Sequence, residues 1–360
     1  MTSSGWDSAG FRDRVQATLD AFLDEQAERL APLGPDATRL LDEARASVSG
    51  GKRFRAAFCY WGHLAVSPDV ASRPDEEDAL IRACASLELL HASALVHDDL
   101  MDASDTRRGR PATHRQFEAD HRSAGWRGVP EQYGAAAAIL LGDLLLSWAD
   151  ELLRRCGLPA AQVGPALDVF DRCRSEVIAG QFLDVSVQAR GLADVDAAMT
   201  VLRYKSAKYS IERPLHIGAA LAGADAGTMR ELTAFGLPLG EAFQLRDDLL
   251  GVFGDPATTG KPAGDDLVEG KRTVLVALAL DAAGREDAEL LHSSLGTQLD
   301  VAAVQRLRGI IDASGAHAQV ETVISELAGR AVAALDRAEV DERARGVLRD
   351  LASAATDRAV

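Results

Sequence analysis

The amino-acid sequence predicts an all-α protein, and three observations support this. Apolar residues recur with the helical period of 3.6 through most of the 360 residues. Ala and Leu are frequent whereas aromatic residues make up only 5% of the chain, which favours helices over strands. No convincing run of alternating β-branched residues is present. We therefore expect a single all-α domain over residues 1–360, without strands.

The predicted helices follow in order along the chain. Residues 11–33 carry an apolar stripe on one helical face, made of Val15, Leu19, Phe22, Leu23 and Leu30. Residues 75–102 are apolar on most sides and predict a central helix that ends in acidic residues. Further helices are expected at about 135–155, 164–188, 195–222, 227–250, 273–283 and from about 300 to the end. Gly and Pro predict turns at 32–36, 157–159 and 253–266.

Charge and composition predict a soluble, cytoplasmic protein. The net charge of −16 repels nucleic acid and acidic membrane surfaces. The N-terminal residues lack the pattern of a signal peptide, and the apolar stretch 135–149 is interrupted by Asp143 and too short to span a bilayer. Four widely spaced cysteines are expected to be buried and reduced: Cys59, Cys84, Cys156 and Cys173. We expect neither a nucleic-acid partner nor an integral membrane segment.

Two acidic clusters are the first sign of a function. Asp98 and Asp102 are four residues apart, so they project from one helical face and can share a hard divalent cation such as Mg²⁺. By itself this cluster is better explained as a solvated acidic helix end. A second pair, Asp247 and Asp248, also follows an apolar helical run. The repetition favours a site that holds several metal ions and a bridging anion.

Basic residues accompany both clusters. Arg107 and Arg108 follow the first cluster, and Lys261 and Lys271 follow the second. A further basic motif, GGKRFR at 50–55, supplies basic groups that can grip a phosphate. Taken alone this motif could be an exposed basic loop, and it lacks the spacing of a Walker loop.

Together these motifs resemble the trans-isoprenyl diphosphate synthases, also called polyprenyl synthetases. The chain has, in that family's order, GGKRFR at 50–55, DDLMD at 98–102 with RRGRP at 107–111, GQFLD at 180–184, KS at 205–206, and FQLRDDLLGVFGD followed by GKPAGDDLVEGKRT at 243–273. The resemblance implies one large helical domain around a deep cavity, usually as a homodimer. It also implies Mg²⁺-dependent condensation of isopentenyl diphosphate with an allylic diphosphate (dimethylallyl, geranyl or farnesyl).

The resemblance also assigns roles to residues of this sequence. Isopentenyl diphosphate would be bound by Lys52, Arg55, His91 and Arg108. The allylic diphosphate would be bound by Arg107, Lys205, Ser206, Gln244, Lys261 and Lys271. Three Mg²⁺ ions would be held by Asp98, Asp102 and Asp247, supported by Asp99 and Asp248. Catalysis would depend on Asp98, Asp99, Asp102, Arg107, Lys205, Asp247 and Asp248. Two other histidines are expected to be structural, His97 and His114.

The chain departs from the family pattern at three positions. Gly251 stands where a third aspartate is common in the second acidic motif, so we expect activity to survive with altered metal affinity. Ser206 replaces the usual threonine and keeps the hydroxyl, and Ala56 replaces a usual proline.

Small residues before the first acidic motif predict the length of the product. In the family, side chains at this place form the floor against which the growing prenyl tail stops. Ser93 and Ala94 are small, whereas Leu90 and Leu87 lie one and two turns deeper. We therefore expect geranylgeranyl diphosphate, with farnesyl or longer polyprenyl diphosphates as alternatives. These residues could also be plain core packing.

Three other classes of protein remain as alternatives. A terpene cyclase shares the fold but needs neither the second diphosphate site nor the second Asp-Asp motif with its lysines. A non-catalytic partner subunit usually has eroded acidic motifs, whereas Gly251 is the single loss here. A structural helical bundle leaves the ordered charged motifs unexplained.

Overall fold

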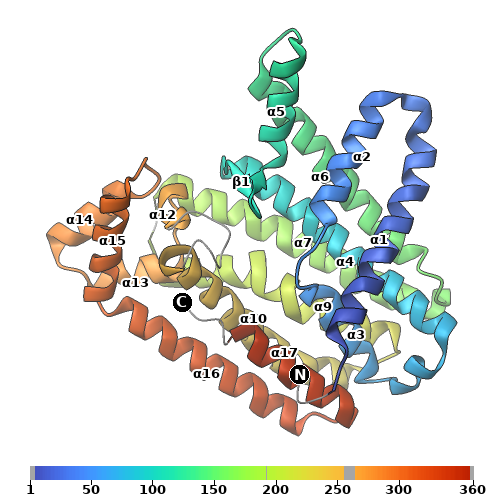
Figure 1. The fold of residues 1–360 in the computed structure, drawn as a ribbon. Coiled ribbons are helices and arrows are strands. Elements are labelled where there is room, and N and C mark those ends of the chain that lie inside the picture. Colours follow the sequence, from blue (N-terminus) through green and yellow to red (C-terminus); the bar gives the residue numbers. More distant parts are fainter. Residues whose placement is uncertain (1–4, 192, 255–263, 357–360) are drawn as a thin grey trace. The chain divides into compact units, whose positions relative to one another are not determined.

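The computed structural model describes residues 5–191, 193–254 and 264–356, and these residues are almost entirely helical (Figure 1). The all-α prediction is confirmed. The chain divides into two compact units, of which the first comprises Met1–Val169, Pro214–Ala224 and Val340–Val347. The second comprises Phe170–Arg213, Asp225–Glu339 and Leu348–Val360. The expectation of a single domain stays a prediction.

The first unit is built around the long helix α4. Its elements are α1 (Ser8–Leu30), η1 (Ala31–Leu33), α2 (Pro35–Val48), α3 (Phe54–Leu64), η2 (Pro68–Ser72), α4 (Pro74–Met101), the short strands β1 (Thr106–Arg107) and β2 (Arg110–Pro111), α5 (Thr113–Ala124), α6 (Pro130–Arg154), the first part of α7 (Ala160–Arg190), most of α9 (Arg213–Leu221) and the first part of α17 (Glu342–Thr356). Helix α4 packs against α1, α3, α5 and α6. The largest fully buried side chains here include Phe58, Trp61, Leu80, Leu89, Leu141 and Leu145.

Helix α4 is long and apolar enough to cross a membrane, but its apolar residues are explained by burial in the protein core. Within its most apolar stretch 78% is buried inside the protein, as in the core helix of a soluble protein. The four cysteines are also buried and free, as predicted.

The second unit is built around helix α10. Its elements are the second part of α7, from Phe170 on, α8 (Val195–Val201), the π-helix η3 (Leu202–Glu212), α10 (Ala226–Phe253), α12 (Asp265–Glu269), α13 (Val274–Ala282), α14 (Arg285–Ser294), α15 (Val301–Ala313), α16 (Ala316–Arg337) and the second part of α17 (Glu342–Thr356). Helix α10 packs along η3 and α16 (Figure 1). Leu245, Leu249 and Val252 of α10 are fully buried in the core of this unit.

Several predicted elements need correction. The expected helix at 195–222 is interrupted by the π-helical segment η3, and the expected helix from about 300 onwards is three helices, α15, α16 and α17. Helices α2, α3, α5 and α14 were not predicted, because their short apolar patterns are hard to distinguish from loops.

The expectation that strands are absent was wrong at one place. Thr106–Arg107 and Arg110–Pro111 form a two-residue antiparallel hairpin, β1 and β2, which is too short to show alternation in sequence. Its turn residues Arg108 and Gly109 both have positive φ, 52° and 73°. Tight hairpin turns of this kind require positive φ at both central positions, which suits Gly109 and constrains Arg108.

Two glycines allow α3 and α9 to cross closely in the first unit. A Cβ on Gly218 would overlap the backbone oxygen of Cys59, and a Cβ on Gly62 would overlap the backbone of Leu215. Because backbone atoms cannot move aside as a flexible side chain can, these positions need glycine.

We predict that Gly218→Ala lowers the free energy of unfolding by about 1–3 kcal/mol through overpacking. The matched control is Gly346→Ala in α17, where an added Cβ meets nothing within 4 Å. This control is expected to gain about 0.5–1 kcal/mol from helix propensity. Urea unfolding measures both changes, and equal stability of the two variants would contradict the packing argument.

Candidate active site

The first acidic cluster lies at the C-terminal end of α4. Asp99 is buried, and Arg107 from the hairpin holds it with two hydrogen bonds from Nε, at 2.8 Å to Oδ1 and 3.1 Å to Oδ2. Arg107 Nη2 also donates to Asp99 Oδ1 and lies 3.9 Å from Asp98 Oδ2. The hairpin therefore holds one guanidinium against the acidic end of the helix.

A basic cluster surrounds His91 on the preceding turns of α4. Burial lowers the pKa of His91 well below its usual value, and the positive charges of Arg55, Arg108, Arg107 and Arg53 lower it further. Burial and the charge of Arg53 also lower the pKa of Arg108. These lowered pKa values reflect repulsion among neighbouring positive charges. The cluster therefore has a strong positive potential that favours binding of an anion.

The segment that carries Lys52 and the first turn of α3 with Arg55 is fixed by a buried ion pair. Arg53 adopts a left-handed conformation with φ of 55°, and its Nη1 lies 3.0 Å from Glu88 Oε2 in α4. Both side chains are about 95% buried, with exposures of 4% and 5%. Glu88 Oε1 also accepts the backbone N–H of Ala56 at 3.3 Å. Since Glu88 lies one turn before His91, the pair fixes the basic loop relative to the basic cluster.

In the second unit, the π-helix η3 carries Lys205 and Ser206. A Cβ on Gly180 would overlap the backbone of Lys205, and a Cβ on Gly240 would overlap that of Ala207. These glycines of α7 and α10 let η3 approach both helices closely. Lys205 Nζ lies 2.5 Å from Asp184 Oδ2, within the GQFLD motif.

A chain of hydrogen bonds joins η3 to the second acidic cluster. Ser206 Oγ donates to Gln244 Oε1, and Gln244 Nε2 donates to Asp248 Oδ1 at 2.8 Å. Burial, and next the negative charge of Asp266, raise the pKa of the Asp248 carboxyl to about 8. A bound cation would lower that pKa again, since an opposite charge favours the ionised form. Asp247, the neighbouring residue, is half-buried.

Lys271 lies beside two other acids of the second unit. Its Nζ is 2.5 Å from Glu269 Oε2 and 3.4 Å from Asp266 Oδ1. Lys261, the other lysine predicted for this site, lies outside the described residues.

The donor set fits Mg²⁺ bound together with an anion. Among the described residues, no group of three or more His, Cys, Asp and Glu side chains forms a ready-made metal site. Mg²⁺ commonly takes one or two carboxylates and fills its remaining positions with phosphate oxygens and water. Asp98 with Asp102, and Asp247 with Asp248, supply hard carboxylate oxygens in such small numbers.

The proposed floor residues lie in the interior of the first unit. Ser93, Leu90 and Leu87 are buried on α4, whereas Ala94 is half-buried. The two remaining histidines lie elsewhere: His97 Nε2 is 3.2 Å from the backbone oxygen of Ile139, and His114 is buried.

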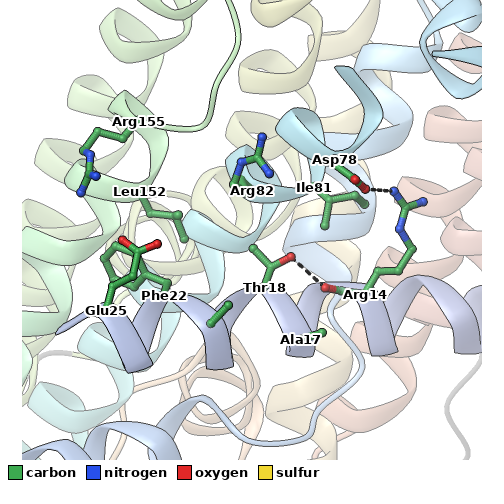
Figure 2. A pocket seen from close by; sticks show the side chains of 11 residues that line it. Arg14, Ala17, Thr18, Phe22, Glu25, Asp78, Ile81, Arg82, Leu152 and Arg155 are labelled. Carbon is green, nitrogen blue, oxygen red and sulfur yellow. Dashed lines mark hydrogen bonds and ion pairs between the residues drawn. The ribbon is translucent and has the colours of Figure 1, made fainter. Parts of the chain in front are cut away.

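A separate cavity of about 460 Å³ lies between α1, α4 and the end of α6 (Figure 2). Within its lining, Arg14 Nη2 donates to Asp78 Oδ1 at 2.8 Å. None of the site residues predicted from the sequence lines this cavity.

Comparison with known proteins identifies the family of the chain. The family model for polyprenyl synthetases matches residues 38–311, which contain both acidic clusters and the basic motif. The chain belongs to the polyprenyl synthetase family. It is a trans-prenyltransferase, an enzyme that extends prenyl diphosphates.

Three known proteins illustrate the similarity. The geranylgeranyl diphosphate synthase of Sulfolobus acidocaldarius is 33% identical, with 70% of this chain and 69% of that one covered. The farnesyl diphosphate synthase of Mycobacterium bovis is 32% identical, with 86% and 80% covered. The solved geranylgeranyl pyrophosphate synthase of Corynebacterium glutamicum, complexed with isoprenyl diphosphate and magnesium, is 41% identical with a TM-score of 0.94. That alignment covers 98% of this chain and 100% of that chain.

These findings confirm the reaction class, while the names of the relatives range from farnesyl to geranylfarnesyl diphosphate synthases. They give no support to a terpene cyclase. The individual site residues stay predictions.

Sequence reasoning missed several residues that support the predicted ones. Arg53, Glu88, Asp184 and Gly240 help to position residues that the sequence predicts to bind substrate, through buried or close contacts. Arg53 and Asp184 lie within the motifs GGKRFR and GQFLD, so their place in the sequence could have indicated a supporting role. Glu88 and Gly240 lie in apolar helical runs, where nothing in the sequence indicates such a role.

We predict that Arg53→Gly and Glu88→Gln each raise the KM for isopentenyl diphosphate roughly tenfold, with the allylic KM changed by less than about threefold. Glycine keeps the left-handed conformation at residue 53 but loses the ion pair. Arg45→Ala, which breaks an exposed pair with Asp24, is the control and should change neither constant. Steady-state kinetics with each substrate varied in turn test this, and equal changes in both constants would contradict a role confined to the basic loop.

Proposed function

We propose that this enzyme makes geranylgeranyl diphosphate from isopentenyl diphosphate and a shorter allylic diphosphate, in the cytoplasm and with Mg²⁺. One observation carries the choice of product. The side chains on the turn before the first acidic cluster, Ser93 and Ala94, are small. The bulkier Leu90 is buried one turn earlier in α4, further from the cluster. Relatives and solved structures named geranylgeranyl synthases support the same length.

The basic cluster of the first unit suits the diphosphate of isopentenyl diphosphate. Lys52, Arg55 and Arg108 would hold it as charged donors, with His91 as an uncharged hydrogen-bond partner because its pKa is lowered. The buried Arg53–Glu88 pair would keep these groups in position before substrate arrives. Binding an anion would relieve the repulsion among the arginines.

The remaining groups suit the allylic diphosphate. Arg107, Lys205, Ser206, Gln244, Lys261 and Lys271 would bind it and stabilise the charge that accumulates as it leaves. Such contacts are strong away from water, at about 4 kcal/mol for a unit pair 4 Å apart at a dielectric of 20, against about 1 kcal/mol in water.

Mg²⁺, in our proposal three ions, would bind to Asp98, Asp102 and Asp247 and neutralise the leaving diphosphate, as the magnesium in the Corynebacterium glutamicum neighbour supports. Asp99 and Asp248 would orient the neighbouring groups. Once the allylic carbon–oxygen bond breaks, the double bond of isopentenyl diphosphate forms the new carbon–carbon bond. The departing diphosphate would then accept the proton that is lost.

The test of this proposal is the product made by the purified chain alone with Mg²⁺, isopentenyl diphosphate and each allylic primer. Mass spectrometry should find a diphosphate of twenty carbons as the main product. A product of fifteen or twenty-five carbons would contradict the assignment of length, and no product with any primer would favour the non-catalytic subunit.

Two variants of α4 are expected to move product length in opposite directions. Ser93→Phe places a ring at the proposed floor and should shorten the main product to fifteen carbons. Leu90→Ala removes bulk one turn deeper and should lengthen it. A general loss of stability cannot change product length in opposite directions. Unchanged product length in both variants would show that Ser93 and Leu90 do not set it.

We also propose a homodimer. Ile178, Phe182 and Val185 form an exposed apolar stripe on α7, where Phe182 is 74% exposed, and Ile139 and Leu140 are exposed on α6. Exposed apolar surface of this kind favours contact with another protein surface, and a second copy fits the family.

We predict that Phe182→Glu converts the dimer to a monomer, because a charge in an apolar interface is costly to bury. Val301→Glu, at an equally exposed apolar residue on α15, is the matched control and should remain dimeric. Light scattering after size exclusion measures the mass, and an unchanged dimer in Phe182→Glu would exclude the α7 stripe.

A further inference from the structure

The π-helix η3 is long for a segment of its kind. π-helical geometry is rare in proteins and occurs mostly as single turns within α-helices, whereas η3 continues for 11 residues. Because a chain seldom adopts this geometry by itself, contacts from neighbouring elements must hold it.

One carboxylate of α7 collects basic groups from the end of η3. Arg213, which directly follows η3, donates from Nε to Glu176 Oε2 at 2.7 Å and from Nη2 to Glu176 Oε1 at 2.8 Å. Lys208 Nζ donates to the same Oε1 at 3.1 Å. The side chains are largely buried, with 16% of Glu176, 13% of Lys208 and 8% of Arg213 exposed. A bidentate arginine–carboxylate pair shielded from water is among the stronger polar contacts in proteins.

The charge of Glu176 is essential to this network. Burial raises the pKa of its carboxyl, but the hydrogen bonds and positive charges of Arg213 and Lys208 bring that pKa below its usual value. Glu176 is therefore ionised at neutral pH. Removing its charge would leave two buried cations without their shared partner, which is strongly unfavourable.

The same face of α7 also contacts Lys205. Glu176, Gly180 and Asp184 are spaced by four residues, so they lie on one face of the helix at successive turns. A Cβ on Gly180 would overlap the backbone N of Lys205, and Asp184 Oδ2 lies 2.5 Å from Lys205 Nζ. One row of α7 residues thus contacts η3 both at its end and at Lys205.

We propose that Glu176 is a positioning residue that fixes the π-helical register of η3 and thereby places Lys205 for the allylic diphosphate. An α-helix bonds each N–H to the carbonyl four residues earlier, and a π-helix to the carbonyl five residues earlier. A change from one to the other turns the chain about its axis and would move Lys205 relative to Asp184. This inference rests on the proposed function, in which Lys205 binds the allylic diphosphate.

Lys208 has an alternative role as a direct ligand of the diphosphate. Its Nζ is bound by Glu176 and also lies 4.8 Å from the centre of the Tyr204 ring. Both contacts hold the ammonium group against the protein, so we assign Lys208 to the network and not to the substrate.

Steady-state kinetics of the purified full chain test the proposal, with each substrate varied in turn. Glu176→Gln keeps the shape of the side chain but removes its charge. The KM for the allylic diphosphate should rise roughly tenfold, and the KM for isopentenyl diphosphate should change less than about twofold. Asp171→Asn makes the same charge change on α7, at an exposed pair with Arg174, and should alter neither constant. Equal allylic KM values in the two variants would overturn the proposal.

The double variant Glu176→Gln with Lys208→Met separates the two roles of Lys208. Lys208→Met should also raise the allylic KM, and the double variant should be no worse than the more affected single variant, because both changes disrupt one network. If Lys208 bound the diphosphate directly, the two effects would multiply. That result would overturn the assignment of Lys208.

Hydrogen exchange measures the hold on η3 without any substrate. Backbone amides of residues 202–212 should exchange faster in Glu176→Gln than in Asp171→Asn, since loss of the buried partner favours local opening. Equal exchange in these variants would show that Glu176 does not fix η3.

A product assay on the wild-type protein keeps the two claims apart. Absence of product would defeat the proposed function, and this inference with it. An active wild type whose Glu176→Gln variant keeps its allylic KM would defeat this inference alone.

Discussion

The aspartates of both clusters lie towards the C-terminal ends of helices, where the helix dipole already concentrates negative charge. Asp98 and Asp99 are in the last turns of α4, and Asp247 and Asp248 are near the end of α10. Neither helix has a basic residue in its last turn. Positive charge must therefore come from elsewhere. This constraint explains the hairpin that brings Arg107 to Asp99 and the segment after α12 that brings Lys271 to Asp266.

Close backbone packing also fixes the segment that carries Lys205 and Ser206. Gly180 and Gly240 admit η3 between α7 and α10, which sets the backbone that carries Lys205 and Ser206. The wide turns of a π-helix are uncommon and frequently occur at functional sites. Gly240 and Gly251 both leave room for a group from another element, namely the backbone of Ala207 and the carboxylate of Asp266.

Patterns within one element could be predicted from the sequence, whereas contacts between elements could not. The apolar stripe of α1 and the acidic end of α4 follow from local spacing; Val15, Leu19, Phe22 and Leu23 are buried as expected, whereas Leu30 is half-buried. The π-helical turns of η3, the partner of Arg53 and the neighbour of Gly251 depend on residues between 15 and 35 positions away. No local pattern specifies such partners, and the hairpin at Thr106–Pro111 was too short to alternate.

In the proposed function, Mg²⁺ and diphosphate bind this enzyme together, because the metal neutralises the aspartates and the diphosphate neutralises the basic residues. This coupling can be measured by thermal unfolding of the wild-type protein in three conditions. These are Mg²⁺ alone, inorganic diphosphate alone, and the two together. Ligands that bind the folded state raise its midpoint, and coupled ligands raise it by more than the sum of their separate effects. We expect a small rise of the unfolding midpoint with either ligand and a much larger rise with both. Purely additive shifts would contradict it.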